Sequence, residues 1–362
     1  MIASDVLTLD EAYRAINFDT ILLLFGMMIV VANLRLSGFF SVVSEWVVEH
    51  AHHPLALLTA IVVVSGAFSA FFVNDTMCLV LTPLVVEITD ALERNPIPYL
   101  LAVAMAANIG SAATITGNPQ NMLIGSFSQI SYRSFAAALS PIAAIGLVVT
   151  IIVIYAFYRS EFRTGVHVKL EHRSIRVNRP LLWKSVAASG GMIALFFAGW
   201  PPPKVAIVAG ALLLLTRRVK PEKIYAQVDW PLLVMFSGLF VVVAGLEKSA
   251  IERTLEMAAA RAHLDSVYVL SGWAAIASNL VSNVPAVLVF KPLITHLADP
   301  IRAWLTLAMS STLAGNLTVL GSVANLIVIQ RARAKVTIEF WEYAKVGIPL
   351  TIATILIGAS LL

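Results

Sequence analysis

Charged residues and cysteine are scarce in this chain. Asp, Glu, Lys and Arg together make up 13% of its 362 residues, and Cys78 is the single cysteine. One cysteine excludes an internal disulfide framework and a thiolate metal cluster. The sequence also lacks a phosphate-binding glycine loop with Lys and Ser or Thr, which argues against an ATP-driven pump. No Ser/His, paired-Asp or HExxH arrangement lies within the apolar stretches, so an enzyme is not expected.

Hydrophobic residues dominate instead, at 59% of the chain with a mean hydropathy of +0.86. Crossing a hydrocarbon core of about 30 Å takes roughly 20 helical residues. The apolar runs are continuous rather than alternating, which indicates helices and not the strands of a barrel. We therefore expect an all-α polytopic membrane protein. Its candidate spans are 19–40, 99–127, 135–158, 181–200, the shorter 204–216, 230–246, 304–329 and 346–362.

The basic residues are concentrated between these spans. They produce the formal net charge of +4 and the pI of about 9.2, and their placement reflects topology rather than nucleic-acid binding. Three basic segments, 159–184, 217–223 and 331–335, are expected on the cytoplasmic side. Both termini then lie outside. We expect a multi-pass protein of the cell (inner or plasma) membrane, with the lipid bilayer as its surroundings and loop 159–180 in the cytoplasm.

The chain also repeats itself at three landmarks in the same order. The matched residues are Phe18 with Trp230 at an offset of 212 (230 − 18), Asn74 with Asn283 at 209 (283 − 74), and Asn121 with Asn325 at 204 (325 − 121). By the loop charges, span 19–40 enters the cytoplasm whereas span 230–246 leaves it, so the halves have opposite orientation. Inverted repeats of this kind are typical of secondary transporters. The expected organisation is a first repeat over 1–158, a cytoplasmic basic linker over 159–180 and a second repeat over 181–362.

The first repeat is expected to be incomplete at its amino end. Two apolar segments, 181–200 and 204–216, precede Trp230, whereas only 17 residues precede Phe18. Subtracting the offset of 212 (230 − 18) places their counterparts almost entirely before Met1. A late start-site assignment or a truncated gene would explain this asymmetry.

Polar residues interrupt the apolar stretch 54–92 near its middle. Both flanks of this stretch must lie on one side of the membrane, which predicts a re-entrant helical hairpin with Asn74, Asp75 and Thr76 at its tip. An intramembrane carboxylate is costly and is a functional candidate by default. The partner hairpin, roughly 266–298, is expected to enter from the opposite face with Ser282 and Asn283 at its tip.

Glycine and proline are expected to break two of the spans. Gly117 and Pro119 lie inside span 99–127, where they would free carbonyl oxygens for a hard cation such as sodium. Helix amino termini at such breaks suit an anion. Sodium is expected at Asn74, Gly117, Asn283 and Gly321. The full predicted set of substrate- and cation-binding residues is Asn74, Asp75, Thr76, Thr114, Gly117, Asn118, Asn121, Ser282, Asn283, Thr318, Gly321, Ser322 and Asn325.

Structural interpretations compete with these assignments. A single asparagine in a membrane often hydrogen-bonds neighbouring helices together, and glycine beside small residues often marks close helix packing. The repetition of the same residues in both halves favours a binding site. Lys291 is open to two interpretations, as a counter-charge for an anion or as a side chain that snorkels or pairs with a carboxylate.

The paired tips, each followed by a proline (Pro83 and Pro292), and the paired breaks TITGNPQN and TVLGSVAN resemble the ion transporter superfamily with a citrate transporter-like domain. That group includes divalent anion:sodium symporters, arsenite permeases and some sodium:proton antiporters, and the resemblance runs from about residue 12 to the end. In the dicarboxylate symporters each tip carries Ser-Asn-Thr. Here the tips read Val-Asn-Asp (73–75) and Ser-Asn-Val (282–284), so the resemblance does not indicate dicarboxylate transport for this chain.

The resemblance implies elevator-like alternating access, in which hairpins and broken spans move as a transport domain against a scaffold, commonly in a homodimer. A sodium ion or a proton would be the coupling ion, with no other cofactor, and Asp75 would carry the proton. The expected function is secondary active transport of a small anion. The alternatives are a sodium:proton antiporter and an arsenite-permease-like membrane subunit, although a soluble ATPase partner is not expected.

Overall fold

The computed structural model describes residues 6–50, 53–163, 177–215, 219–248 and 263–362. Every regular element in these ranges is helical. Five of the described helices are long and apolar enough to cross a membrane, namely α2 (Phe18–Ser37), α4 (Pro54–Phe71), α8 (Tyr132–Phe157), α10 (Arg179–Phe197) and α19 (Phe340–Leu361). The expected all-α polytopic membrane fold is confirmed. Most of the predicted basic linker, 164–176, lies outside the described residues.

Shorter helices complete the described architecture, and several begin at a capping residue followed by proline. They are α1 (Leu9–Ala15), α3 (Phe39–His50), α5 (Asn74–Ala91), α6 (Pro96–Ser111), α7 (Pro119–Ser128), α9 (Arg159–Arg163), α11 (Pro202–Leu215), α12 (Pro221–Tyr225), α13 (Trp230–Glu247), α15 (Val267–Val281), α16 (Asn283–Ile294), α17 (Pro300–Leu313) and α18 (Val323–Ala332). The predicted span 19–40 ends earlier than expected, because Gly38 adopts a left-handed φ of 85° and the chain continues as α3.

The two predicted hairpins are present as helix pairs. Helices α4 and α5 form the first and α15 and α16 the second, and each pair turns through one residue with positive φ, Val73 (58°) or Ser282 (75°). These residues are repeat equivalents at the hairpin offset of 209 (282 − 73). A β-branched residue at positive φ is strained, at a cost of roughly 1–3 kcal/mol, and persists only where its surroundings enforce it.

The residues predicted at the first hairpin tip, Asn74, Asp75 and Thr76, form the first turn of α5. The connection itself is made by Phe72 and Val73, because Phe72 closes α4 by bonding its N–H to the carbonyl of Phe68. The three predicted residues therefore directly follow this connection.

Both predicted broken spans are interrupted where expected. Helix α6 stops at Ser111 and α7 starts at Pro119, and α17 stops at Leu313 before two short 3-10 turns lead into α18. Helix α6 runs through the centre of the molecule and is buried from Pro98 to its end. It packs closely on α4, because a Cβ on Gly110 would lie 2.1 Å from the carbonyl oxygen of Gly66.

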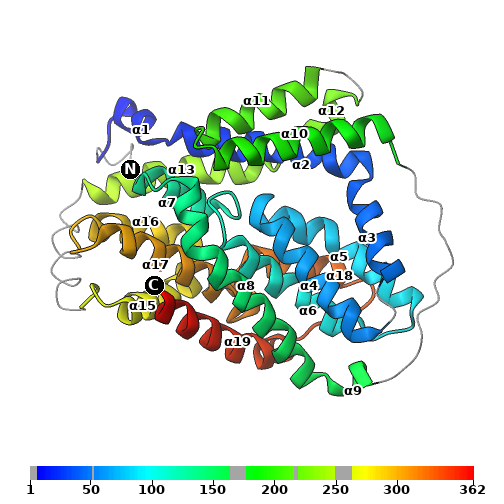
Figure 1. The fold of residues 1–362 in the computed structure, drawn as a ribbon. Coiled ribbons are helices and arrows are strands. Elements are labelled where there is room, and N and C mark those ends of the chain that lie inside the picture. The colour runs from blue at the N-terminus through cyan, green and yellow to red at the C-terminus, as the bar shows by residue number, and fades with distance from the viewer. Residues whose placement is uncertain (1–5, 51–52, 164–176, 216–218, 249–262) are drawn as a thin grey trace.

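The helices run broadly from one end of the molecule to the other (Figure 1). Helices α2, α10 and α11 lie together along one side, and Gly26 of α2 comes so close to α11 that a Cβ would lie 2.6 Å from a backbone atom of Ala206. The first hairpin lies toward the same end as α9 and α12. The second hairpin lies toward the end that holds α1 and the close of α19. Which end faces the cytoplasm stays a prediction.

Candidate functional site

The two breaks are held by the same side-chain contact. In each break one asparagine amide donates to two carbonyl oxygens that the interrupted helix leaves without their usual partners. The contacts are Asn121 Nδ2 to Ser111 O (3.1 Å) and Thr114 O (3.0 Å), and Asn325 Nδ2 to Gly315 O (2.7 Å) and Thr318 O (3.0 Å). Each residue of the second set follows its counterpart by 204 positions (325 − 121), so residues matched by this sequence offset make the same hydrogen bonds.

Contacts across the halves pair in the same way. Ser322 Oγ donates to Asn108 Oδ1 at 2.9 Å, and Asn118 Nδ2 donates to Thr312 Oγ1 at 3.2 Å. The offset of 204 (322 − 118) relates Asn118 to Ser322 and Asn108 to Thr312. One contact is therefore the other with the two halves exchanged, as in an isologous two-fold interface.

Asn108 is the hub of this buried cluster. Its Nδ2 donates to Asn316 Oδ1 at 2.8 Å and to Asn325 Oδ1 at 2.9 Å. Its Oδ1 accepts from Asn74 Nδ2 at 3.0 Å in addition to Ser322. All five side chains are buried. The first hairpin, α6 and the second break thus meet at one point, which we call the amide cluster: Asn74, Asn108, Asn316, Ser322 and Asn325.

The predicted sodium-binding positions are brought together only in the first half. The N–H of Asn74 donates to the carbonyl of Gly117 at 2.9 Å, so this tip is tied directly to this break. Asn283 instead accepts a hydrogen bond of 2.5 Å from Ser278 of its own hairpin. Gly321 lies beside Asn279, whose Oδ1 would be 2.8 Å from a Cβ built at that glycine.

Several buried acceptor oxygens at this site have no partner. Asn74 Oδ1, Asn121 Oδ1 and Asn279 Oδ1 make no hydrogen bond within the described chain. A buried polar atom left in this way costs about 1–3 kcal/mol. Oxygen acceptors are also the ligands that hard cations take. The orphaned oxygens therefore fit a cation that enters and leaves.

The helix starts at the site differ in their capping. Asn118 caps α7 by accepting from the N–H of Asn121, and Ser322 caps α18 by accepting from the N–H of Ala324. Within the described chain, no side chain caps the first turn of α5 or α16, the two helices that begin at the hairpin tips. An uncapped helix start carries partial positive charge, which suits an anion.

Other predicted site residues lie outside the amide cluster. Thr114 Oγ1 donates to the carbonyl of Ala70, and Ser282 is exposed at its tip. Asp75 and Thr76 line a separate cavity of about 90 Å³ that also holds Arg35 and Asp229. Asn74, Asp75 and Thr76 are neighbours in the chain, but the fold places Asn74 in the amide cluster and the other two in this cavity.

Sequence reasoning missed several members of the site. Asn108, Asn279, Thr312 and Asn316 were not singled out, although each is a polar residue inside an apolar run. That pattern was the available signal. Comparison of the two repeats could not identify Asn316, because the residue at the equivalent position, at the offset of 204 (316 − 112), is Ala112.

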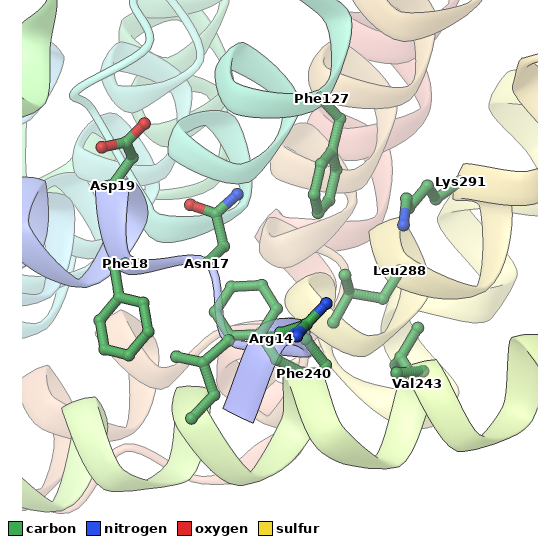
Figure 2. A pocket seen from close by; sticks show the side chains of 12 residues that line it. Arg14, Asn17, Phe18, Asp19, Phe127, Phe240, Val243, Leu288 and Lys291 are labelled. Carbon is green, nitrogen blue, oxygen red and sulfur yellow. The ribbon is translucent and has the colours of Figure 1, made fainter. Parts of the chain in front are cut away.

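A second, larger cavity of about 530 Å³ lies between α1, α13 and α16 (Figure 2). The two cavities are lined by residues at equivalent positions of the repeat. In the larger cavity these are Phe240, Val243, Ala244, Leu288 and Asn17, and their counterparts in the smaller cavity are, in the same order, Met28, Val31, Ala32, Leu79 and Asp229. The offsets of these pairs are the landmark values of 212 (240 − 28) and 209 (288 − 79). The two halves therefore contain equivalent cavities of unequal size.

Solved structures contain the same fold. The YdaH transporter of Alcanivorax borkumensis, described in its crystal structure as having an unusual topology, superposes with a TM-score of 0.67 at 12% identity. The match covers 95% of this chain and 83% of that one. At this identity the likeness shows the fold alone.

Sequence comparison shows the family. The silicon efflux transporter LSI3 of Oryza sativa subsp. japonica is 31% identical over 437 residues, which cover 100% of this chain and 90% of the relative. The arsB protein of Dictyostelium discoideum is 23% identical over 477 residues, covering 100% of this chain and 85% of its own. The model of the CitMHS family, described as citrate transporter, matches residues 1–314. The chain is a multi-pass membrane protein that belongs to the CitMHS citrate transporter family.

Proposed function

We propose that this protein is a secondary active transporter that carries a small anion across the membrane with sodium or protons as the coupling ion. The observation that carries the proposal is the amide cluster, where a hairpin tip and two broken helices meet around buried, unpartnered oxygens. Secondary transporters place substrate and ion sites at broken helices near the middle of the bilayer.

The coupling ion is assigned to the first half of the site. Asn74 Oδ1 and Asn121 Oδ1 are unpartnered, and the carbonyl of Gly117 is joined to the backbone of Asn74. This group supplies oxygen ligands, which hard cations such as sodium take. Asp75 is the proposed proton carrier if protons replace sodium, from its place in the neighbouring cavity.

The anion is assigned to the uncapped starts of α5 and α16. Each helix amino terminus carries partial positive charge, which compensates a negative charge without a buried basic residue. The rice relative is named a silicon efflux transporter. We apply to this chain only the class of substrate that this name indicates, a small solute. A small solute agrees with a site built of amides and hydroxyls.

We further propose inverted repeats over 1–158 and 181–362, related through the amide cluster, and a homodimer in the inner or plasma membrane. The opposed hairpins support the inversion (Figure 1), and the exchanged pairs Asn108–Ser322 and Asn118–Thr312 support the two-fold relation. The basic segments place 159–180 in the cytoplasm.

Uptake into proteoliposomes tests the function. Purified protein is reconstituted and offered labelled citrate, phosphate, sulfate, arsenite and silicate, each with an inward sodium gradient, an inward proton gradient or neither. We expect accumulation of at least one anion that depends on one gradient and stops when the gradient is collapsed by an ionophore. Sodium–proton exchange without any anion would instead establish an antiporter and contradict the proposal.

A further inference from the structure

The two repeat-related cavities carry opposite charge. The larger cavity contains Arg14 and Lys291 against one carboxylate, Asp19. The smaller cavity contains Arg35 against two carboxylates, Asp75 and Asp229. The two cavities are equivalent in the repeat but differ in the charge of the residues that line them.

The charge difference comes from specific replacements at equivalent positions. At the offset of 209 (291 − 82), Lys291 stands where the first half has Thr82, and Asp75 stands where the second half has Val284. At the offset of 212 (229 − 17), Asp229 stands where the first half has Asn17. The larger cavity has therefore gained a cation at one equivalent position and lacks both carboxylates of the smaller one.

The basic side chains reach the larger cavity from different elements. Lys291 belongs to α16 and lies with its Nζ 4.9 Å from the ring centre of Phe127 in α7. Arg14 comes from α1, on the opposite wall (Figure 2). Arg14 also pairs with Asp10 at 3.0 Å, but with side chains 77% and 69% exposed this surface pair is weak.

Resting on the proposed function, we propose that the larger cavity is an anion-accepting vestibule, in which Arg14 and Lys291 gather small anions before they pass to the uncapped starts of α5 and α16. A cleft lined by one sign of charge and by apolar walls focuses its field and raises the local concentration of oppositely charged solutes. Leu288, Val243 and Phe240 supply the apolar walls. The smaller, acidic cavity is its repeat-related counterpart.

Charged thiol reagents measure the potential in the vestibule without any transport. Ala244 and Ala32 are equivalent alanines at the offset of 212 (244 − 32), one in each cavity, and each is replaced by cysteine in a Cys78→Ser background. In purified protein, the anionic reagent MTS-ethylsulfonate should label Ala244→Cys faster than the cationic MTS-ethyltrimethylammonium. Ala32→Cys should react slowly with both, because its cavity is small, at about 90 Å³, and Ala32 is buried.

Removal of the basic side chains should abolish the preference. The double variant Arg14→Gln/Lys291→Gln is expected to lower the anion-to-cation rate ratio at Ala244→Cys by about tenfold at low salt, and Lys291→Arg should preserve it. Arg133→Gln, an exposed change at the start of α8, is the matched control. In proteoliposomes the double variant should raise KM for the carried anion while sparing the maximal rate.

Two outcomes would overturn the vestibule. One is an unchanged ratio in the double variant, and the other is labelling of Ala32→Cys as fast as that of Ala244→Cys. If no anion is taken up but the charge-dependent ratio is found, the proposed transport function fails while the anion-attracting cavity stands. The two readouts therefore separate the proposals.

Discussion

Ser322 Oγ donates to Asn108 Oδ1 across the two halves of the chain at 2.9 Å. Exchanging the halves turns this contact into the one between Asn118 and Thr312, at 3.2 Å. Each break is thus fastened to the central helix of the other repeat. A movement of one half relative to the other would have to break both contacts, so the breaks are expected to move together as one unit.

Loss of the hairpin-tip asparagines should stop transport. Asn74→Ala removes a donor to Asn108 and an orphaned oxygen, and Asn283→Ala removes the acceptor for Ser278. We expect each variant to reduce uptake by more than tenfold while remaining folded by gel filtration. Thr150→Val is the matched control, because this buried hydroxyl bonds only within α8. Near-normal uptake by both alanine variants would remove these residues from the site.

The paired amides should both contribute to stability. Asn121→Leu and Asn325→Leu each remove an amide donor to two buried carbonyl oxygens, and Asn325→Leu also removes an acceptor for Asn108. Each is expected to lower the free energy of unfolding by about 1–3 kcal/mol. Thermal unfolding in detergent measures the effect as a fall in Tm. A fall for one variant and none for the other would argue against equivalent roles in the two repeats.

The carboxylate of Asp75 should control ion coupling. It shares its cavity with Arg35 and Asp229, so its protonation or cation binding changes the local charge balance. Asp75→Asn is expected to flatten the pH dependence of uptake or to change its sodium dependence. Asp90→Asn is the control on the same helix, since Asp90 is exposed and pairs with Lys335 at 2.9 Å. Wild-type pH and sodium profiles in Asp75→Asn would make this residue structural.

The smaller cavity should open when its polar bridge is removed. Arg35 Nη1 donates to Gln227 Oε1 at 2.7 Å, which joins α2 to the segment after α12 beside this cavity. Gln227→Ala should raise the thiol-labelling rate of Ala32→Cys several-fold. A rate that stays at the background level would show that packing alone closes this side.

Glycine substitutions should separate close packing from open helix surface. Gly110→Ala would place a Cβ 2.1 Å from the backbone of Gly66, whereas no described atom lies within 4 Å of a Cβ at Gly190 in α10. We expect Gly110→Ala to lower Tm and expression. Gly190→Ala should raise stability by about 0.5–1 kcal/mol, because alanine favours the helix. Equal tolerance of the two changes would contradict the close α4–α6 contact.

Local sequence determined where the chain could and could not continue as a helix. Gly117 and Pro119 remove helical hydrogen bonding at one place, and the breaks and hairpin turns follow at the predicted positions. The repetition of Asn121 as Asn325 similarly marked two equivalent positions at the breaks. These are local effects, so residue type and spacing are sufficient to predict them.

Tertiary packing decided which polar residues meet. Asn74 and Asp75 are neighbours in the chain, but successive residues of a helix point roughly 100° apart. Packing of α5 against α6 turns Asn74 toward Asn108 and leaves Asp75 in a cavity beside α2. Asn108 and Asn316 meet only because α6 and the second break cross at the centre. Hydropathy and spacing describe each helix alone, and the direction in which a side chain points depends on what packs against that helix.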